Sequence, residues 1–165
     1  MNVTTSQPTT FGHRLPQELV ASSLFLLKRL GFTAKDRTMT AYEGTGLHPY
    51  HHAVLTVLDE GARETQGSIA DALGYDHGQL VGLLDELEER GLVERKRDPN
   101  DRRRHLVSMT PDGRKTLKRL RALSAEIEDA FLAPLDAAER EQLHDLLHRV
   151  AQVQEPRCAP LNPSA

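Results

Sequence analysis

Positive charge is concentrated in one short stretch of the sequence, from Arg90 to His105. Seven lysines and arginines in it stand against three acids, whereas the whole chain carries a formal charge of −3. Three of the arginines are consecutive and directly follow Asp101. Guanidinium groups bind phosphate oxygens through paired hydrogen bonds, so an arginine cluster of this density is suited to a polyanion. The stretch therefore predicts a short basic segment that binds nucleic acid, within a chain that is otherwise acidic.

The elements around this stretch predict how it is held. Two apolar pairs, Leu92-Val93 and Leu106-Val107, frame the basic residues as two strands of a hairpin. A short helix capped by Thr65 and ended by Gly74 precedes it, followed by a longer helix with Asp76 and Gln79 as its capping box, stopped at Gly91. Short helix, tight turn, longer helix and hairpin together predict a mainly α fold built on a winged helix-turn-helix.

Further helices lie on both sides of this unit. Apolar residues at helical spacing predict a helix from Pro16 to about Glu43, weakened at Gly31, and another opened by Pro49 and closed by Gly61. Beyond the hairpin, Thr110 and Pro111 open a helix that Pro134 ends, and Asp136 with Glu139 caps a last one. The first helix and the last two carry apolar stripes that a small winged unit cannot bury. They predict a helical dimerisation region, with a monomer that caps itself as the alternative.

We therefore expect four kinds of segment along the chain. They are a disordered N-terminus at 1–13, a dimerisation region at 14–48 and 111–154, a DNA-binding lobe at 49–110 and a flexible tail at 155–165.

Composition excludes several classes of protein. The chain has 165 residues and a single cysteine, Cys158, so it has no internal disulfide, and we expect a reducing cytoplasm. No apolar run is long enough to span a membrane. No nucleophile with its base, no phosphate-binding glycine loop and no metal cage emerges from the spacing, so we expect neither an enzyme nor a cofactor.

Three motifs resemble the MarR family of bacterial transcription regulators. They are Leu-Glu-Glu-Arg-Gly-Leu-Val at 87–93, Asp-Pro-Asn-Asp-Arg-Arg at 98–103 and Leu-Val-Ser-Met-Thr-Pro-Asp-Gly at 106–113. The likeness extends from about residue 15 to 153. It implies a homodimer that binds a pseudo-palindromic operator in double-stranded DNA, usually as a repressor released by a small ligand.

The predicted base-reading residues lie on the first turns of the longer helix. They are His77, Gln79, Val81 and Gly82. Gln79 can pair with adenine and Val81 can contact a thymine methyl group, whereas His77 can contact a phosphate; a purely capping role for Gln79 stays open. The chain departs from the resemblance at Gly82 and Glu86, where relatives often carry basic residues.

This loss of charge leaves more of the binding to the wing. The resemblance implies that Asp101 orients Arg103 into the minor groove. A minor groove that is narrow and A·T-rich has a strong negative potential, which attracts a guanidinium. The neighbouring candidates for DNA contacts are Arg95, Arg97, Arg102 and Arg104.

The resemblance also implies a cleft for a small effector. We expect this effector to be aromatic or lipophilic and, in one interpretation, anionic. The candidate lining residues are Phe25, Arg29, Tyr50, His51 and His52, with packing or surface roles as the alternative.

Histidines raise the question of a metal. His48, His51 and His52 are close in sequence, and His144 and His148 are four residues apart. Because no cysteine is near, we expect no metal site, and Cys158 is a poor redox sensor. A winged-helix module for protein interaction, or a nonspecific DNA binder, stays open beside the sequence-specific regulator.

Overall fold

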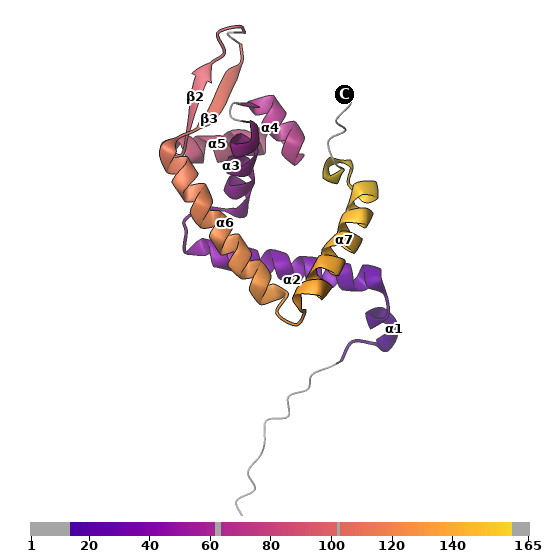
Figure 1. The fold of residues 1–165 in the computed structure, drawn as a ribbon. Coiled ribbons are helices and arrows are strands. Elements are labelled where there is room, and N and C mark those ends of the chain that lie inside the picture. Colours follow the sequence, from indigo (N-terminus) through magenta and orange to yellow (C-terminus); the bar gives the residue numbers. More distant parts are fainter. Residues whose placement is uncertain (1–13, 62–63, 102, 160–165) are drawn as a thin grey trace, which may run out of the picture. The chain divides into compact units, whose positions relative to one another are not determined.

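The computed structural model describes residues 14–61, 64–101 and 103–159, and it is mostly helical (Figure 1). The predicted disordered segment at 1–13 lies outside the described residues. No helix in the described part of the chain is long and apolar enough to cross a membrane. In chain order the elements are α1 (Gln17–Val20), α2 (Ser23–Glu43), α3 (Pro49–Gly61), β1 (Glu64–Thr65), α4 (Gln66–Leu73), α5 (His77–Glu89), β2 (Val93–Arg97), β3 (His105–Met109), α6 (Pro111–Phe131), α7 (Ala137–Gln154) and a short 3-10 helix, η1 (Pro156–Cys158).

The chain divides after Asp36, within α2, into two compact units. In the first unit the predicted single helix is wrong at one point, because α1 ends at Val20 and α2 begins at Ser23. Ser22 accounts for the restart, since its hydroxyl accepts a hydrogen bond from the Phe25 amide at 3.3 Å. Gly31, the predicted weak point, lies inside α2 without a break.

The second unit contains the hydrophobic core. Leucines from α3, α5 and α6 meet Val107 of β3 there, with Tyr42 from the end of α2. The stripe predicted on α5 is confirmed, because Leu80, Leu83, Leu84 and Leu87 are all buried. Burial on one face leaves the other face of α5 in solvent, which is what a recognition helix requires.

The predicted helix-turn-helix is confirmed. Thr65 and Ser68 form a reciprocal capping box at the start of α4, and Gly74 ends that helix with a φ of 64°, a conformation that glycine adopts without strain. Asp76 caps α5 by accepting the amide hydrogens of Gly78 and Gln79 at 2.8 and 3.3 Å. The predicted reciprocal bond from the Gln79 side chain is wrong, because no such bond occurs in the described structure.

The wing is a hairpin within a three-stranded antiparallel sheet. Its strands β2 and β3 pair from Val93↔Met109 to Arg97↔His105 and extend beyond α3, α4 and α5 (Figure 1). The two-stranded prediction missed β1, which pairs with the other edge of β3 in the order β1-β3-β2. A two-residue strand leaves no periodicity to read in a sequence.

The C-terminal helices follow their predicted caps. Thr110 accepts the Gly113 amide hydrogen at 3.0 Å, and Asp136 with Glu139 forms the predicted capping box. Helix α6 ends at Phe131, ahead of Pro134. In the segment predicted to be a flexible tail, Pro156–Cys158 form η1, and the Arg157 guanidinium lies where a Cβ on Gly74 would stand.

Candidate nucleic-acid interface

The wing tip is shaped by hydrogen bonds from its own acidic side chains. The Asn100 amide donates to Asp98 Oδ1 at 2.8 Å, and the Arg103 amide donates to Asp101 Oδ1 at 3.0 Å. The Asp98 amide closes the hairpin by donating to the Arg104 carbonyl at 3.0 Å. These side-chain turns explain why aspartates are interleaved with the arginines, because they fold the backbone without a hydrophobic anchor.

The same Asp101 carboxylate orients the arginines that follow it. Its Oδ1 is 3.3 Å from Arg103 Nε, and its Oδ2 is 3.4 Å from Arg104 Nε. The Arg103 side chain is nevertheless 92% exposed and that of Arg104 67% exposed. The predicted contact between Asp101 and Arg103 is therefore present, and it leaves both guanidinium groups accessible to a ligand. Arg102, the third member of the triplet, lies outside the described residues.

Arg95, one of the predicted DNA contacts, is held against α5 by hydrogen bonds. Its Nε donates to Glu88 Oε2 at 2.8 Å, its Nη2 contacts both Glu88 and Asp85, and its amide donates to Glu88 Oε1. These hydrogen bonds lower the pKa of the Glu88 carboxyl and raise that of Arg95. The cation thus neutralises the acidic face of α5, and we leave Arg95 out of the interface.

The base-reading candidates all lie on the exposed side of α5. His77, Gln79, Val81 and Gly82 are exposed. In the described part of the chain, apart from the helix's own backbone and the adjacent residues, no atom lies within 4 Å of where a Cβ on Gly82 would be. The Gln79 side chain takes no part in the helix cap, so it is available to a base edge. Their DNA contacts remain predictions.

A hollow of about 530 Å³ lies between the wing and the start of α4. Residues Gln66, Gly67 and Ser68 line one side and Arg103, Arg104 and His105 the other. Arg97, paired across the hairpin with His105, is also exposed.

The base of the wing is locked onto α6. The Thr110 hydroxyl donates to the Gly91 carbonyl at 2.7 Å, and the Thr110 amide donates to the Leu92 carbonyl at 3.0 Å. A Cβ on Gly113 would overlap that Leu92 carbonyl, so only glycine allows the first turn of α6 this close. The third sequence motif is therefore the joint between the wing and α6.

The histidines predicted for an effector cleft are engaged within the fold. His51 is 2% exposed; its Nδ1 accepts the His48 amide hydrogen at 2.9 Å, and its Nε2 is 3.1 Å from Glu86 on α5. The Nε2 contact is not aligned as a hydrogen bond, so we regard it as electrostatic. Burial lowers the pKa of His51, against a smaller opposing effect of Glu86.

The other predicted cleft residues also pack. His52 Nδ1 is 2.7 Å from the buried Tyr42 hydroxyl, and burial lowers the pKa of His52. The Tyr50 ring contacts His48 and Tyr75. These contacts fit the packing alternative. Phe25 and Arg29 lie on α2 in the first unit, and their part in a cleft remains a prediction.

The two histidines of α7 contact each other. The rings of His144 and His148 stack on α7 with centroids 5.7 Å apart. Across the described residues, no three His, Cys, Asp or Glu side chains are grouped so that they could hold a metal ion. Cys158 is exposed in η1.

Sequence reasoning missed the contact between Arg95 and the recognition helix. Asp85 and Glu88 are three residues apart, which places both carboxylates on one face of α5 and offers a signal. The contact joins residues up to ten positions apart across a turn, so helix spacing alone does not reveal the arginine partner.

Comparison with known proteins agrees with this geometry. The model of the MarR family matches residues 45–104, a range that includes α3, α4, α5 and β2. A putative transcriptional regulatory protein for the hcr operon of Thauera aromatica is 35% identical over 114 residues, which cover 69% of this chain and 68% of that protein.

Solved structures extend the match beyond the lobe. A MarR-family transcriptional regulator from Rhodococcus sp. RHA1 is 32% identical with a TM-score of 0.69, covering 84% of this chain and 96% of the other. CouR from Rhodococcus jostii RHA1, solved bound to p-coumaroyl-CoA, is 31% identical with a TM-score of 0.68, covering 82% and 96%. The chain belongs to the MarR family of transcriptional regulators and is not an enzyme.

Proposed function

We propose that this chain is a homodimeric regulator that binds a pseudo-palindromic operator, with α5 in the major groove and the wing in the minor groove. The observation that carries the proposal is the wing tip, where Asp101 orients an Arg103 side chain that is 92% exposed. A weakly hydrated guanidinium held in this way is suited to the negative potential of a narrow minor groove.

The remaining contacts divide between bases and phosphates. Gln79 is proposed to read adenine and Val81 a thymine methyl group, while His77 contacts a phosphate. Arg97 and Arg104, which are exposed on the hairpin, are proposed phosphate contacts. Arg102 is proposed as another from its place in the basic sequence. Gly82 lies on the same exposed face of α5 and adds no charge.

Unburied apolar residues support the homodimer. Helix α7 has no buried residue, and Leu146, Leu147, Val150 and Val153 are exposed on it. In the first unit, Leu24 and Phe32 are 77% and 63% exposed. Apolar surfaces of this kind usually mark an interface. We assign residues 14–48 and 111–154 to dimerisation and 49–110 to DNA binding.

Repression relieved by a small molecule completes the proposal. CouR, a structural neighbour, was solved with p-coumaroyl-CoA, which supports a ligand-responsive mechanism in this chain. The proposed place of action is the cytoplasm, where the operator is accessible.

The experiment combines light scattering with an electrophoretic shift on DNA upstream of the chain's own gene. We expect a dimer mass, and a shift that survives excess unrelated DNA. Leu146→Asp with Val150→Asp should give a monomer that binds more weakly. A shift abolished by unrelated competitor DNA would favour a nonspecific binder, and no shift at all would favour a protein-interaction module.

A further inference from the structure

The outer edge of the wing is covered by a side chain of the recognition helix. Strand β2 lies at the edge of the sheet, since the strand order is β1-β3-β2. An edge strand has backbone amides with no neighbouring strand, and each needs another hydrogen-bond partner. The Arg95 amide donates to Glu88 Oε1 at 3.1 Å. The Glu88 carboxylate of α5 therefore takes the place of a further strand beside β2.

The Arg95 side chain reinforces the same contact. Its Nε donates to Glu88 Oε2 at 2.8 Å, and its Nη2 contacts both Glu88 and Asp85. The Arg95 side chain is 21% exposed, against 92% for that of Arg103 at the tip. Hydrogen bonds from both the backbone and the guanidinium to one carboxylate fix its orientation better than a simple surface ion pair does.

The contact lies at the level where the sheet is held from its other edge. Arg95 pairs across the hairpin with Val107, which is fully buried and pairs on its other side with Glu64 of β1. The hairpin continues beyond this level to its exposed tip. A strand rises about 3.3 Å per residue, so Asn100 lies up to roughly 16 Å beyond Arg95. A small tilt of the hairpin at Arg95 is therefore enlarged at the tip.

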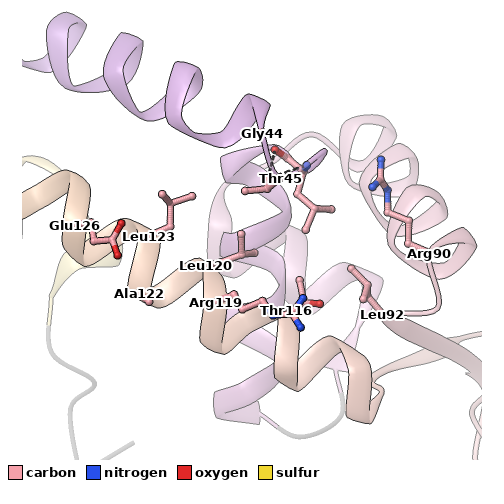
Figure 2. A pocket seen from close by; sticks show the side chains of 11 residues that line it. Gly44, Thr45, Arg90, Leu92, Thr116, Arg119, Leu120, Ala122, Leu123 and Glu126 are labelled. Carbon is pink, nitrogen blue, oxygen red and sulfur yellow. Dashed lines mark hydrogen bonds between the residues drawn. The ribbon is translucent and has the colours of Figure 1, made fainter.

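The base of the wing is fixed by contacts of a different kind. The chain leaves α5 through Gly91, whose φ is 68°, and the Leu92 amide donates to the Leu87 carbonyl at 2.9 Å. Figure 2 shows Leu92 on this connection, where it lines a pocket of about 700 Å³ together with Thr116 and Leu120 of α6. These contacts hold the start of β2. The tilt of the hairpin depends on contacts farther along it.

We infer that Arg95 and Glu88 form a brace that positions the wing relative to the recognition helix, so that Arg103 and α5 meet DNA together. Arg95 is a positioning residue, because it acts through Arg103 and makes no DNA contact of its own. The effect of the brace on DNA binding rests on the proposed function, whereas its effect on the wing does not.

The mobility of the wing tip tests the brace on the full chain without DNA. The chain has a single cysteine, so Cys158→Ser with Asn100→Cys allows one nitroxide label to be placed at the exposed tip. We expect the electron paramagnetic resonance spectrum to show a more mobile label in Arg95→Met and in Glu88→Ala. The two variants break the brace from different elements, and circular dichroism checks that each is folded.

Each of these variants has a matched control. Lys96→Met makes the same change of charge as Arg95→Met, on the exposed side chain that follows in β2 and points to the other face of the sheet. Glu89→Ala makes the same change as Glu88→Ala, on an exposed neighbour in α5. Both controls should leave the spectrum unchanged. A tip label that is as mobile in the controls as in the brace variants, or unchanged in all four, would overturn the brace.

Operator binding separates the brace from an effect of charge. Arg95→Met lowers the charge of the chain by one and Glu88→Ala raises it by one, so charge alone would change operator affinity in opposite directions. The brace predicts that both changes reduce the cost of Arg103→Ala, at least about threefold, because the tip is no longer held in the groove. A cost of Arg103→Ala that is the same in all backgrounds would overturn the role of Arg95 in DNA binding.

The two measurements also separate this inference from the proposed function. If the brace variants loosen the tip but the chain shifts no operator, the positioning of the wing stands and the regulator proposal fails. If the operator shifts but the tip is equally mobile in every variant, the brace alone fails.

Discussion

The recognition helix and the wing meet the same proposed DNA with opposite electrostatics. On α5, Asp85 and Glu88 form ion pairs with Arg95, so the surface of the helix is partly neutralised. Shape and hydrogen bonding are then left to determine which bases the helix recognises. On the wing, a single Asp101 orients two arginines whose charge stays in solvent. The difference indicates a division of labour, in which the wing supplies attraction and the helix supplies discrimination.

The largest expected effect comes from the wing. Arg103→Ala should weaken operator binding by roughly 1–3 kcal/mol per half-site, or about 5- to 150-fold, because it removes a contact inside a groove. The measurement is fluorescence anisotropy with labelled operator, and Lys115→Ala on α6 is the control for charge. Affinity equal to that of wild type would remove Arg103 from the groove.

The helix should respond through specificity. Gln79→Ala is expected to lower operator affinity about tenfold and to make binding indifferent to one A·T pair. Thermal stability should stay the same, because the cap uses the Gln79 amide and not its side chain. A drop in melting temperature without a change in base preference would return Gln79 to a structural role.

Adding charge to the helix tests the division of labour from the other side. Gly82→Arg places a cation in open space and should steepen the salt dependence of binding by about one unit per protomer. Gly82→Ala is the matched control, because both changes improve helix propensity by roughly 1 kcal/mol. If the two variants bind alike at every salt concentration, position 82 faces away from phosphate.

The smallest expected effect is on the pH dependence of folding stability, and it involves His51, which packs against the recognition helix. Burial lowers the pKa of His51 below its ordinary 6.5, so the unfolded chain binds more protons as pH falls through that value. Stability should thus be complete above about pH 6.5 and decline below it. Chemical denaturation at pH 7.5 and 5.5 measures the decline.

His51→Gln should reduce this decline, and His144→Gln, an exposed histidine on α7, should not. His51 lies beside Glu86 of α5, Arg90 at the end of α5, and His48. The loss of stability at low pH therefore reports on the packing of His51 against α5. An identical decline in the His51 variant would assign the pH dependence to other groups, with His52 the first to test.

The fold was largely predictable because its signals are local. Caps at Thr65, Asp76, Thr110 and Asp136 satisfy amides within three residues, and burial at helical spacing shows directly in a sequence. The contact between Asp101 and Arg103 was expected from the resemblance and is present. The features that were not predicted depend on contacts between distant segments. Strand β1 pairs with β3, and Arg95 contacts α5.

The effector side was less predictable for a related reason. A histidine buried between two helices and one lining a cleft leave the same mark in a sequence, and only packing separates them. Resemblance to a family predicts where in the fold a site lies better than it predicts which residues line the site.

The turns of the wing tip have a further consequence for hydrogen exchange. Burial declines along the hairpin from Val93 and Val107 toward the tip, where Asp98 and Asp101 hold the backbone through single hydrogen bonds. Such bonds open without unfolding the core, so tip amides should exchange with solvent far faster than the amide of Val107. Their slowing on an operator fragment would register contact residue by residue.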